Sequence, residues 1–215
     1  MSNSEDEPPP RKRYRPSIPE PYIELTFVNV QNFNFPTVMI CQLNDCTSRK
    51  LHINSFAWDL AVNFNYANPY QHRLLGPYPN LAAEICRREP GTVEILYPPP
   101  GRQGPSFACL YGQYKIGKPD SKYYINLPKT DARYNYMADY KDTYQHRLQY
   151  FQQCLNQLLL TLYSNHYYKT VVFPKYIGCD MAQGDWNDYE PMIARFCHEL
   201  KARKPYMDIF IVNKL

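Results

Sequence analysis

The segment that decides the fold is TVVFPKYIGCDMAQGDW, residues 170–186. Its β-branched start, Thr170-Val171-Val172-Phe173, has the composition of a buried strand, and Pro174 ends it. A loop rich in small residues follows, and apolar residues then recur at helical spacing over residues 187–203. A strand, a glycine-containing loop and a helix N-terminus in this order can present backbone N–H groups to an anion. The segment therefore predicts a phosphate-binding loop.

The start of the predicted helix decides which N–H groups are available. Asn187 is expected as the N-cap, because Asn187 and Glu190 have the spacing of a capping box. Pro191 would then lie in the first turn, where its missing N–H removes no intrahelical hydrogen bond. The phosphate donors would be the N–H groups of residues 178–184.

The other strands and helices alternate along the chain. Apolar patterns predict strands over residues 22–30, 37–41, 92–96, 106–111, 170–173 and 207–212 and helices over residues 55–64, 143–164 and 187–203. Such alternation is typical of an α/β protein, so we expect a three-layer α/β/α fold with a mixed, largely parallel central sheet. Ligands bind such sheets at the carboxyl ends of the strands. The loops 42–50, 112–118 and 177–186 qualify.

Composition narrows the class of protein. The chain has 215 residues, 44% of them hydrophobic, and a net charge of +4. This charge is too small to indicate nucleic acid by itself. No apolar run reaches the roughly 18 residues of a membrane span, and no apolar signal segment opens the chain. The seven cysteines form no C-x-x-C pair and the five histidines show no ligand spacing. We therefore expect an intracellular protein in a reducing compartment, without metal, cofactor or membrane.

The N-terminal residues include few apolar side chains that a hydrophobic core could bury. We expect residues 1–19 to be a disordered, proline-rich and charged tail and residues 20–215 to be the domain. The basic cluster Arg11–Arg15 within the tail is either a nuclear-import signal or a solvated basic run. A nuclear location follows from the first interpretation, and a cytoplasmic one otherwise.

Several motifs resemble the macro domain, the ADP-ribose-binding module. Phe173-Pro174 followed by Ile177-Gly178-Cys179 and Gly184-Asp185-Trp186 is similar to the second phosphate loop of that family. Residues 110–114 with Gly117-Lys118 resemble a strand and turn of one of its branches, and residues 211–215 resemble its last strand. The resemblance covers roughly residues 22–215 and is specific in the 170–200 segment.

The resemblance implies a function and a site. The chain would bind ADP-ribose, a related nucleotide diphosphate or an ADP-ribosylated protein. Adenine would lie near Asn29 and the last strand, the diphosphate on loop 177–184, and the distal ribose near Asn44 and residues 47–52. The implied ligand-binding residues are Asn29, Asn44, Gln113, Gly178, Cys179, Asp180, Met181, Ala182, Gln183, Gly184 and Asn213. As an enzyme it would hydrolyse ADP-ribosyl adducts or ADP-ribose 1''-phosphate, with Asn44, Asp180 and Asp185 as catalytic candidates.

The chain departs from the family at the phosphate loops. Residues 47–52 stand where the family has a glycine triplet, and Asp180 stands where it has glycine. Ala182 stands where one hydrolase branch has a catalytic aspartate. A carboxylate beside a diphosphate is repulsive by about 1 kcal/mol in water, although aspartate tolerates a left-handed backbone. Cys179, near a helix N-terminus, is a packing residue in this pattern rather than a nucleophile.

Two alternatives therefore stay open. One is a macro-fold interaction module that has lost the nucleotide, and the other is a nucleic-acid-binding protein. The second would use the Tyr123–Tyr150 stretch, where tyrosine interleaves with lysine and arginine. Three aspartates in that stretch make nucleic acid the weaker alternative.

Overall fold

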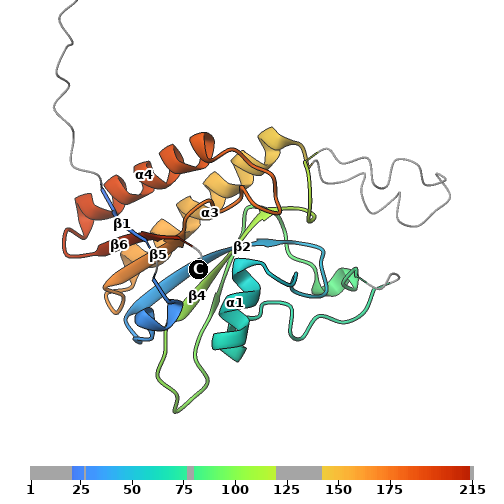
Figure 1. The fold of residues 1–215 in the computed structure, drawn as a ribbon, viewed down its shortest axis with the longest axis horizontal. Helices are drawn as coiled ribbons and strands as arrows, with labels where there is room; N and C mark the ends of the chain where they lie inside the picture. The colour runs from blue at the N-terminus through green and yellow to red at the C-terminus, as the bar shows by residue number, and fades with distance from the viewer. Residues whose placement is uncertain (1–20, 27, 77–79, 120–141, 214–215) are drawn as a thin grey trace, which may run out of the picture.

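A six-stranded sheet in the order β1-β6-β5-β2-β4-β3 forms the centre of the molecule (Figure 1). The computed structural model describes residues 21–26, 28–76, 80–119 and 142–213. Five strands are parallel: β1 (Ile23–Leu25), β2 (Val38–Asp45), β4 (Ser106–Gln113), β5 (Thr170–Pro174) and β6 (Asp208–Val212). Only β3 (Val93–Leu96) runs antiparallel, against β4. The predicted mixed, largely parallel sheet is confirmed.

Helices cover both faces of this sheet. The long helices α3 (Tyr144–Ser164) and α4 (Trp186–Arg203) pack on one face, and α1 (Phe56–Asn63) packs on the other. A hydrophobic core lies on each face of the sheet, and alternate residues of β2 point into the two cores. Met39 lies under α3 and α4, whereas Ile40 packs with Leu60 of α1. Short 3-10 helices complete the fold: η1 (Val30–Phe33), η2 (Asn65–Ala67) and η3 (Glu84–Cys86). The predicted three-layer α/β/α architecture is confirmed.

Side-chain caps fix where α1 and α3 begin. Ser55 caps α1 by accepting the Trp58 N–H. Thr143 does the same for α3 by accepting the His146 N–H. Each cap satisfies one of the N–H groups that have no partner inside a helix.

The start of α4 differs from the prediction. Asp185, rather than Asn187, is the N-cap, because its carboxylate accepts the Asn187 N–H at 2.9 Å. Pro191 consequently lies in the second turn and not in the first. Its missing N–H leaves the carbonyl of Asn187 without an intrahelical donor. Glu190 also serves a tertiary contact instead of a capping box, accepting the Tyr22 hydroxyl at 2.8 Å.

Two strand boundaries also differ. The predicted strand over residues 22–30 is reduced to β1, which spans residues 23–25. The predicted strand over residues 37–41 continues to Asp45, because Gln42, Leu43 and Asp45 pair with β4. Asn44 therefore belongs to a strand and not to a loop.

Some predictions fall outside the described residues. These are the tail over residues 1–19 and most of the tyrosine-rich stretch, whose residues 123–141 are not described. In the portion of the chain that is described, no helix is both long enough and apolar enough to cross a membrane.

Candidate ligand cavity

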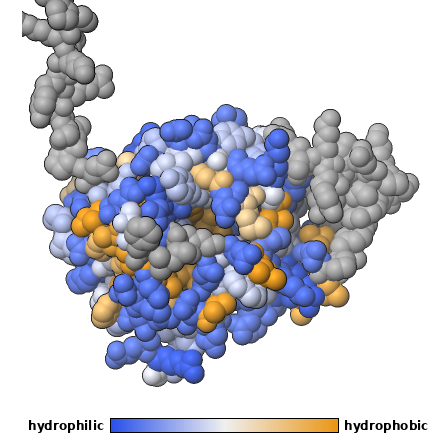
Figure 2. Space-filling model, in the orientation of Figure 1, coloured by the Kyte–Doolittle hydropathy of each residue, from blue (hydrophilic) through white to orange (hydrophobic). Residues whose placement is uncertain are grey.

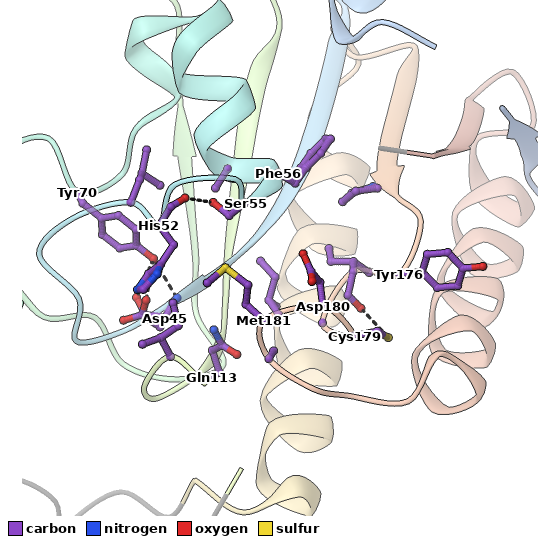
Figure 3. Close-up of a pocket in the computed structure, with 18 of the residues that line it drawn as sticks. Asp45, His52, Ser55, Phe56, Tyr70, Gln113, Tyr176, Cys179, Asp180 and Met181 are labelled. Carbon is purple, nitrogen blue, oxygen red and sulfur yellow. Dashed lines mark hydrogen bonds between the residues drawn. The ribbon is translucent and has the colours of Figure 1, made fainter. Parts of the chain in front are cut away.

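A cavity of about 470 Å³ opens where β2, β4 and β5 end (Figure 3). Volumes of roughly 300–1,000 Å³ are typical of small-molecule sites. The loop after β5 forms one wall, and the ends of β2 and β4 with the start of α1 form the rest. The lining residues are Leu43, Asp45, 50–52, 55–57, Tyr70, Gln113, Ile116 and 174–182. The cavity lies at the edge where α/β sheets bind ligands.

The loop after β5 is shaped by hydrogen bonds within itself. They run from the N–H of Cys179 to the carbonyl of Tyr176 at 2.9 Å, from Gln183 to Asp180 at 3.0 Å, and from Gly184 to Gly178 at 2.8 Å. These three N–H groups are thus occupied, so the predicted donor set of residues 178–184 is too large. The N–H groups of Asp180, Met181 and Ala182 donate to no other described residue. They form a run of three amides on the cavity wall, a geometry suited to an anion.

The two glycines of this loop are required by packing. Gly178 has φ +81°, and a Cβ there would lie 2.5 Å from Cε1 of Tyr189. At Gly184 a Cβ would lie 2.5 Å from the Gly178 carbonyl oxygen and 2.6 Å from Cε2 of the same ring. Tyr189 is buried in α4, so its ring fills the space beneath the loop. The glycines therefore allow the loop to close over α4.

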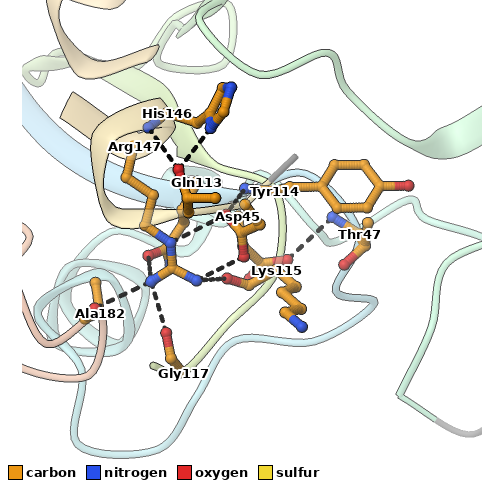
Figure 4. A network of polar contacts seen from close by, with 11 residues as sticks. Asp45, Thr47, Gln113, Tyr114, Lys115, Gly117, His146, Arg147 and Ala182 are labelled. Carbon is orange, nitrogen blue, oxygen red and sulfur yellow. Dashed lines mark hydrogen bonds and ion pairs between the residues drawn. The ribbon is translucent and has the colours of Figure 1, made fainter. Parts of the chain in front are cut away.

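A buried arginine fixes the far end of the loop (Figure 4). Arg147, 1% exposed, donates to the carbonyl of Ala182 at 3.0 Å and to that of Gly117 at 2.6 Å. It also forms a bidentate ion pair with Asp142, with N–O distances of 3.0 and 2.6 Å. Gln113 at the end of β4 accepts a longer bond of 3.4 Å. One side chain thus joins α3, the segment after β4 and the loop after β5.

Asp45 at the end of β2 places a carboxyl group at the cavity, in addition to that of Asp180 on the loop after β5. It is 3% exposed, and its Oδ1 accepts the N–H groups of Thr47 at 3.0 Å and Ser48 at 2.5 Å. The Tyr70 hydroxyl lies 3.3 Å from Oδ2. Burial raises the pKa of Asp45, while the Ser48 hydrogen bonds and the charge of Arg73 act in the opposite direction.

Arg73 holds the turn that follows Asp45. Its guanidinium lies over the Tyr70 ring at 4.4 Å and over the Tyr111 ring at 5.6 Å. It donates to the carbonyls of Cys46 at 2.9 Å and Ser48 at 2.7 Å. Its Nε and Nη2 atoms are buried without a hydrogen-bond partner. The charge of Arg73 is therefore near Asp45 but directed at backbone oxygens.

The N-terminus of α1 faces the same cavity. Phe56 and Ala57 are lining residues, and first-turn N–H groups have no partner inside a helix. The Ser55 hydroxyl takes the Trp58 N–H at 3.1 Å, which leaves those of Phe56 and Ala57. A second set of unbonded amides therefore contributes to the cavity wall.

The residues that the sequence singles out divide into two groups. Gln113, Gly178, Cys179, Asp180, Met181 and Ala182 line the cavity. Figure 3 shows the Asp180 carboxyl group projecting into it, with the Met181 side chain extending toward Asp45. Gln183 and Gly184 belong to the same loop without lining the cavity.

The remaining predicted residues have other roles. Asp185 caps α4, and Asn29 caps η1 by accepting the Gln31 N–H at 2.9 Å. The backbone N–H of Asn213 donates to Leu25 at 3.1 Å. Asn44, 2% exposed, lies beside the Tyr70 hydroxyl. Of the three catalytic candidates, Asp180 alone lines the cavity.

Cys179 has the character of a packing residue. Burial, with smaller contributions from Asp185 and Asp188, raises the pKa of its thiol to about 12. The Sγ atom lies 3.6 Å from the Ile177 carbonyl oxygen. A thiol that stays protonated at neutral pH is a poor nucleophile.

Comparison with known proteins identifies the fold. The structure is similar to that of the macrodomain of Mycobacterium tuberculosis DarG, with a TM-score of 0.51 and 13% sequence identity. The similarity covers 90% of this chain and 99% of that macrodomain chain. No protein-family model matches the sequence, and no curated protein matches it. The chain therefore has a macrodomain-like fold.

Proposed function

We propose that the cavity binds ADP-ribose or a related nucleotide diphosphate, free or attached to a protein. The observation that carries the proposal is the pair of unbonded amide sets in one cavity wall. Asp180, Met181 and Ala182 provide one set, and Phe56 and Ala57 at the start of α1 provide the other. Backbone N–H groups at a loop and at a helix N-terminus suit two linked phosphates. The macrodomain-like fold supports the same ligand class.

The position of the cavity supports one orientation of the proposed ligand. All lining residues come from β2, β4, β5 and the segments that follow these strands, with Tyr70. A diphosphate on the 180–182 amides would direct the distal ribose toward the end of β2. The adenosine would extend over the β6 and β1 side, where Asn213 and Asn29 lie.

Charges around the cavity partly oppose an anion. Lys50 and Lys175 line the cavity, but Lys175 is already paired with Glu24. Asp180 places a carboxylate beside the amides. As an enzyme the protein would hydrolyse a bond at the distal ribose, with Asp180 acting on the attacking water.

Calorimetric titration with ADP-ribose tests the proposal. We compare the wild type with Asp180→Asn, which removes one charge while keeping the shape of the side chain. Relief of about 1 kcal/mol of repulsion predicts roughly five-fold tighter binding. Asp208→Asn is the matched control, because Asp208 begins β6 and is exposed at the opposite end of the strand. It should bind as the wild type does.

Two results would contradict the proposal. Unchanged affinity in Asp180→Asn would mean that the phosphates do not contact this loop. No heat with any variant would favour an interaction module without a nucleotide, which the two cavity carboxyl groups of Asp45 and Asp180 support. On the face shown in Figure 2, however, hydrophobic residues stand in small groups among hydrophilic ones, rather than in a broad patch typical of a protein partner site.

A further inference from the structure

Asp45 retains hydrogen-bonding capacity toward the cavity. An ionised carboxylate offers about four lone-pair sites. The N–H groups of Thr47 and Ser48 and the Ser48 side chain use three of them, and the fourth faces the Tyr70 hydroxyl at 3.3 Å, longer than an ordinary O–H···O hydrogen bond. Because Asp45 also lines the cavity, a ligand hydroxyl placed at the end of β2 would replace this long contact with a shorter hydrogen bond.

The negative charge of Asp45 is not cancelled by a direct ion pair. Among the described residues no lysine or arginine nitrogen forms a salt bridge with it. Arg73 is near, but its hydrogen bonds go to the carbonyls of Cys46 and Ser48. Burial limits the screening of Asp45 by water, and at an effective dielectric constant of about 20 a charge pair interacts about four-fold more strongly than in water. A phosphate beside Asp45 would therefore be strongly disfavoured.

We infer that Asp45 makes the distal end of the cavity selective for an uncharged, hydroxyl-bearing group. The ligand is then ADP-ribose or its adduct with a protein, and a terminal phosphate on the distal ribose is rejected. The inference rests on the proposed function and distinguishes between the two substrate classes that it allows. Asp45 acts here as a specificity-determining residue, whereas the amides of residues 180–182 bind the phosphates that both classes share.

A paired titration tests the selectivity directly. ADP-ribose and ADP-ribose 1''-phosphate are titrated by calorimetry into the wild type, Asp45→Asn and Asp180→Asn. The wild type should bind ADP-ribose at least ten-fold more tightly than the phosphorylated ligand. Asp45→Asn should reduce that ratio at least three-fold. Asp180→Asn should change both affinities by a similar factor and leave the ratio unchanged.

The outcomes separate this inference from the proposed function. Equal or tighter binding of the phosphorylated ligand by the wild type overturns the selectivity but leaves nucleotide binding intact. An unchanged ratio of the two affinities in a folded Asp45→Asn variant also overturns the selectivity. Binding of neither ligand overturns the proposed function and this inference with it. Thermal melting reports whether Asp45→Asn is folded, and if it is not, the wild-type ratio alone decides.

Discussion

Arg147 shows how one buried side chain can position a loop. It lies four residues before Phe151 on the buried face of α3, yet it carries a charge. All three guanidinium nitrogens donate hydrogen bonds, either to the Asp142 carboxylate or to backbone carbonyls that include that of Lys115. A buried ion pair is stable only when its hydrogen bonds are satisfied in this way. A charged residue in an apolar helical stripe is the sequence signal that could have identified it.

Removal of Arg147 should therefore be costly. We predict that Arg147→Met lowers the free energy of unfolding by about 3–5 kcal/mol, because Asp142 is left buried and unpaired. The loop after β5 also loses its contact with Arg147 at the Ala182 carbonyl. Urea unfolding of the wild type and the variant measures the difference.

A second arginine provides the matched control. Arg88 also forms a bidentate pair, with Glu94, but its side chain is 41% exposed. Arg88→Met should cost less than about 1 kcal/mol, because exposed ion pairs are weak. Equal losses in the two variants would show that burial of the Arg147 pair does not determine its contribution.

At the scale of elements, the loop after β5 and α4 form one unit. The ring of Tyr189 occupies the space that side chains at Gly178 and Gly184 would need. Asp185 ends the loop and caps α4 at the same time. The shape of the loop after β5 thus depends on the helix beneath it.

Substitution of Gly178 tests this dependence. Gly178→Ala and Gly101→Ala both place an alanine at φ +81°, but a Cβ at Gly101 meets nothing within 4 Å. The left-handed backbone should cost roughly 1–2 kcal/mol in each variant. Overlap with Tyr189 should add about 1–3 kcal/mol at Gly178 alone. Denaturant unfolding measures both losses, and a Gly178→Ala loss no larger than that of Gly101→Ala would contradict the packing argument.

The sequence predicts these elements well where apolar spacing is regular. The stripe of α3 and the β-branched start of β5 follow directly from composition and period. The end of β2 does not, because Gln42 and Asn44 interrupt the apolar run. The fold buries Gln42 by bonding its amide to the Ala67 carbonyl at 2.9 Å, a partner distant in the sequence. A local sequence pattern does not predict a hydrogen bond to so distant a partner.

The cavity was predictable to a similar degree. The loop after β5 carries its own motif, and it lines the cavity as expected. The sequence does not predict Tyr70 and includes Asp45 only as part of loop 42–50, because the two residues are 25 apart and meet only in the folded chain. Asn29 and Asn213 were assigned by resemblance and lie outside the cavity lining. Their role in binding adenine stays a prediction.

At the scale of the whole molecule, the hydrophobic cores enclose many cysteine thiols and tyrosine phenols in their neutral, protonated form. All seven cysteines are free thiols, and five of them are buried. Burial raises the pKa of the Cys197 thiol to about 12 and raises the pKa of Tyr189 in the same direction. Thiolates and phenolates are thus excluded from the cores that hold the sheet between its helices.

This exclusion predicts a loss of stability in alkali. Because the pKa of Cys197 is raised above its ordinary value of 9.0, the folded state keeps a proton that the unfolded chain releases. The contribution of the protonated Cys197 thiol to the free energy of unfolding is fully present below pH 9. It is lost as pH rises from 9.0 toward about 12. Each such group should lower the free energy of unfolding by up to about 1.4 kcal/mol per pH unit in that window. Urea unfolding under reducing conditions between roughly pH 8 and pH 10.5 measures the slope. Cys197→Ala should be less stable at pH 8 but have a shallower slope, because one titrating group is gone. A wild-type free energy that stays constant across the range would show that these thiols and phenols titrate alike in both states.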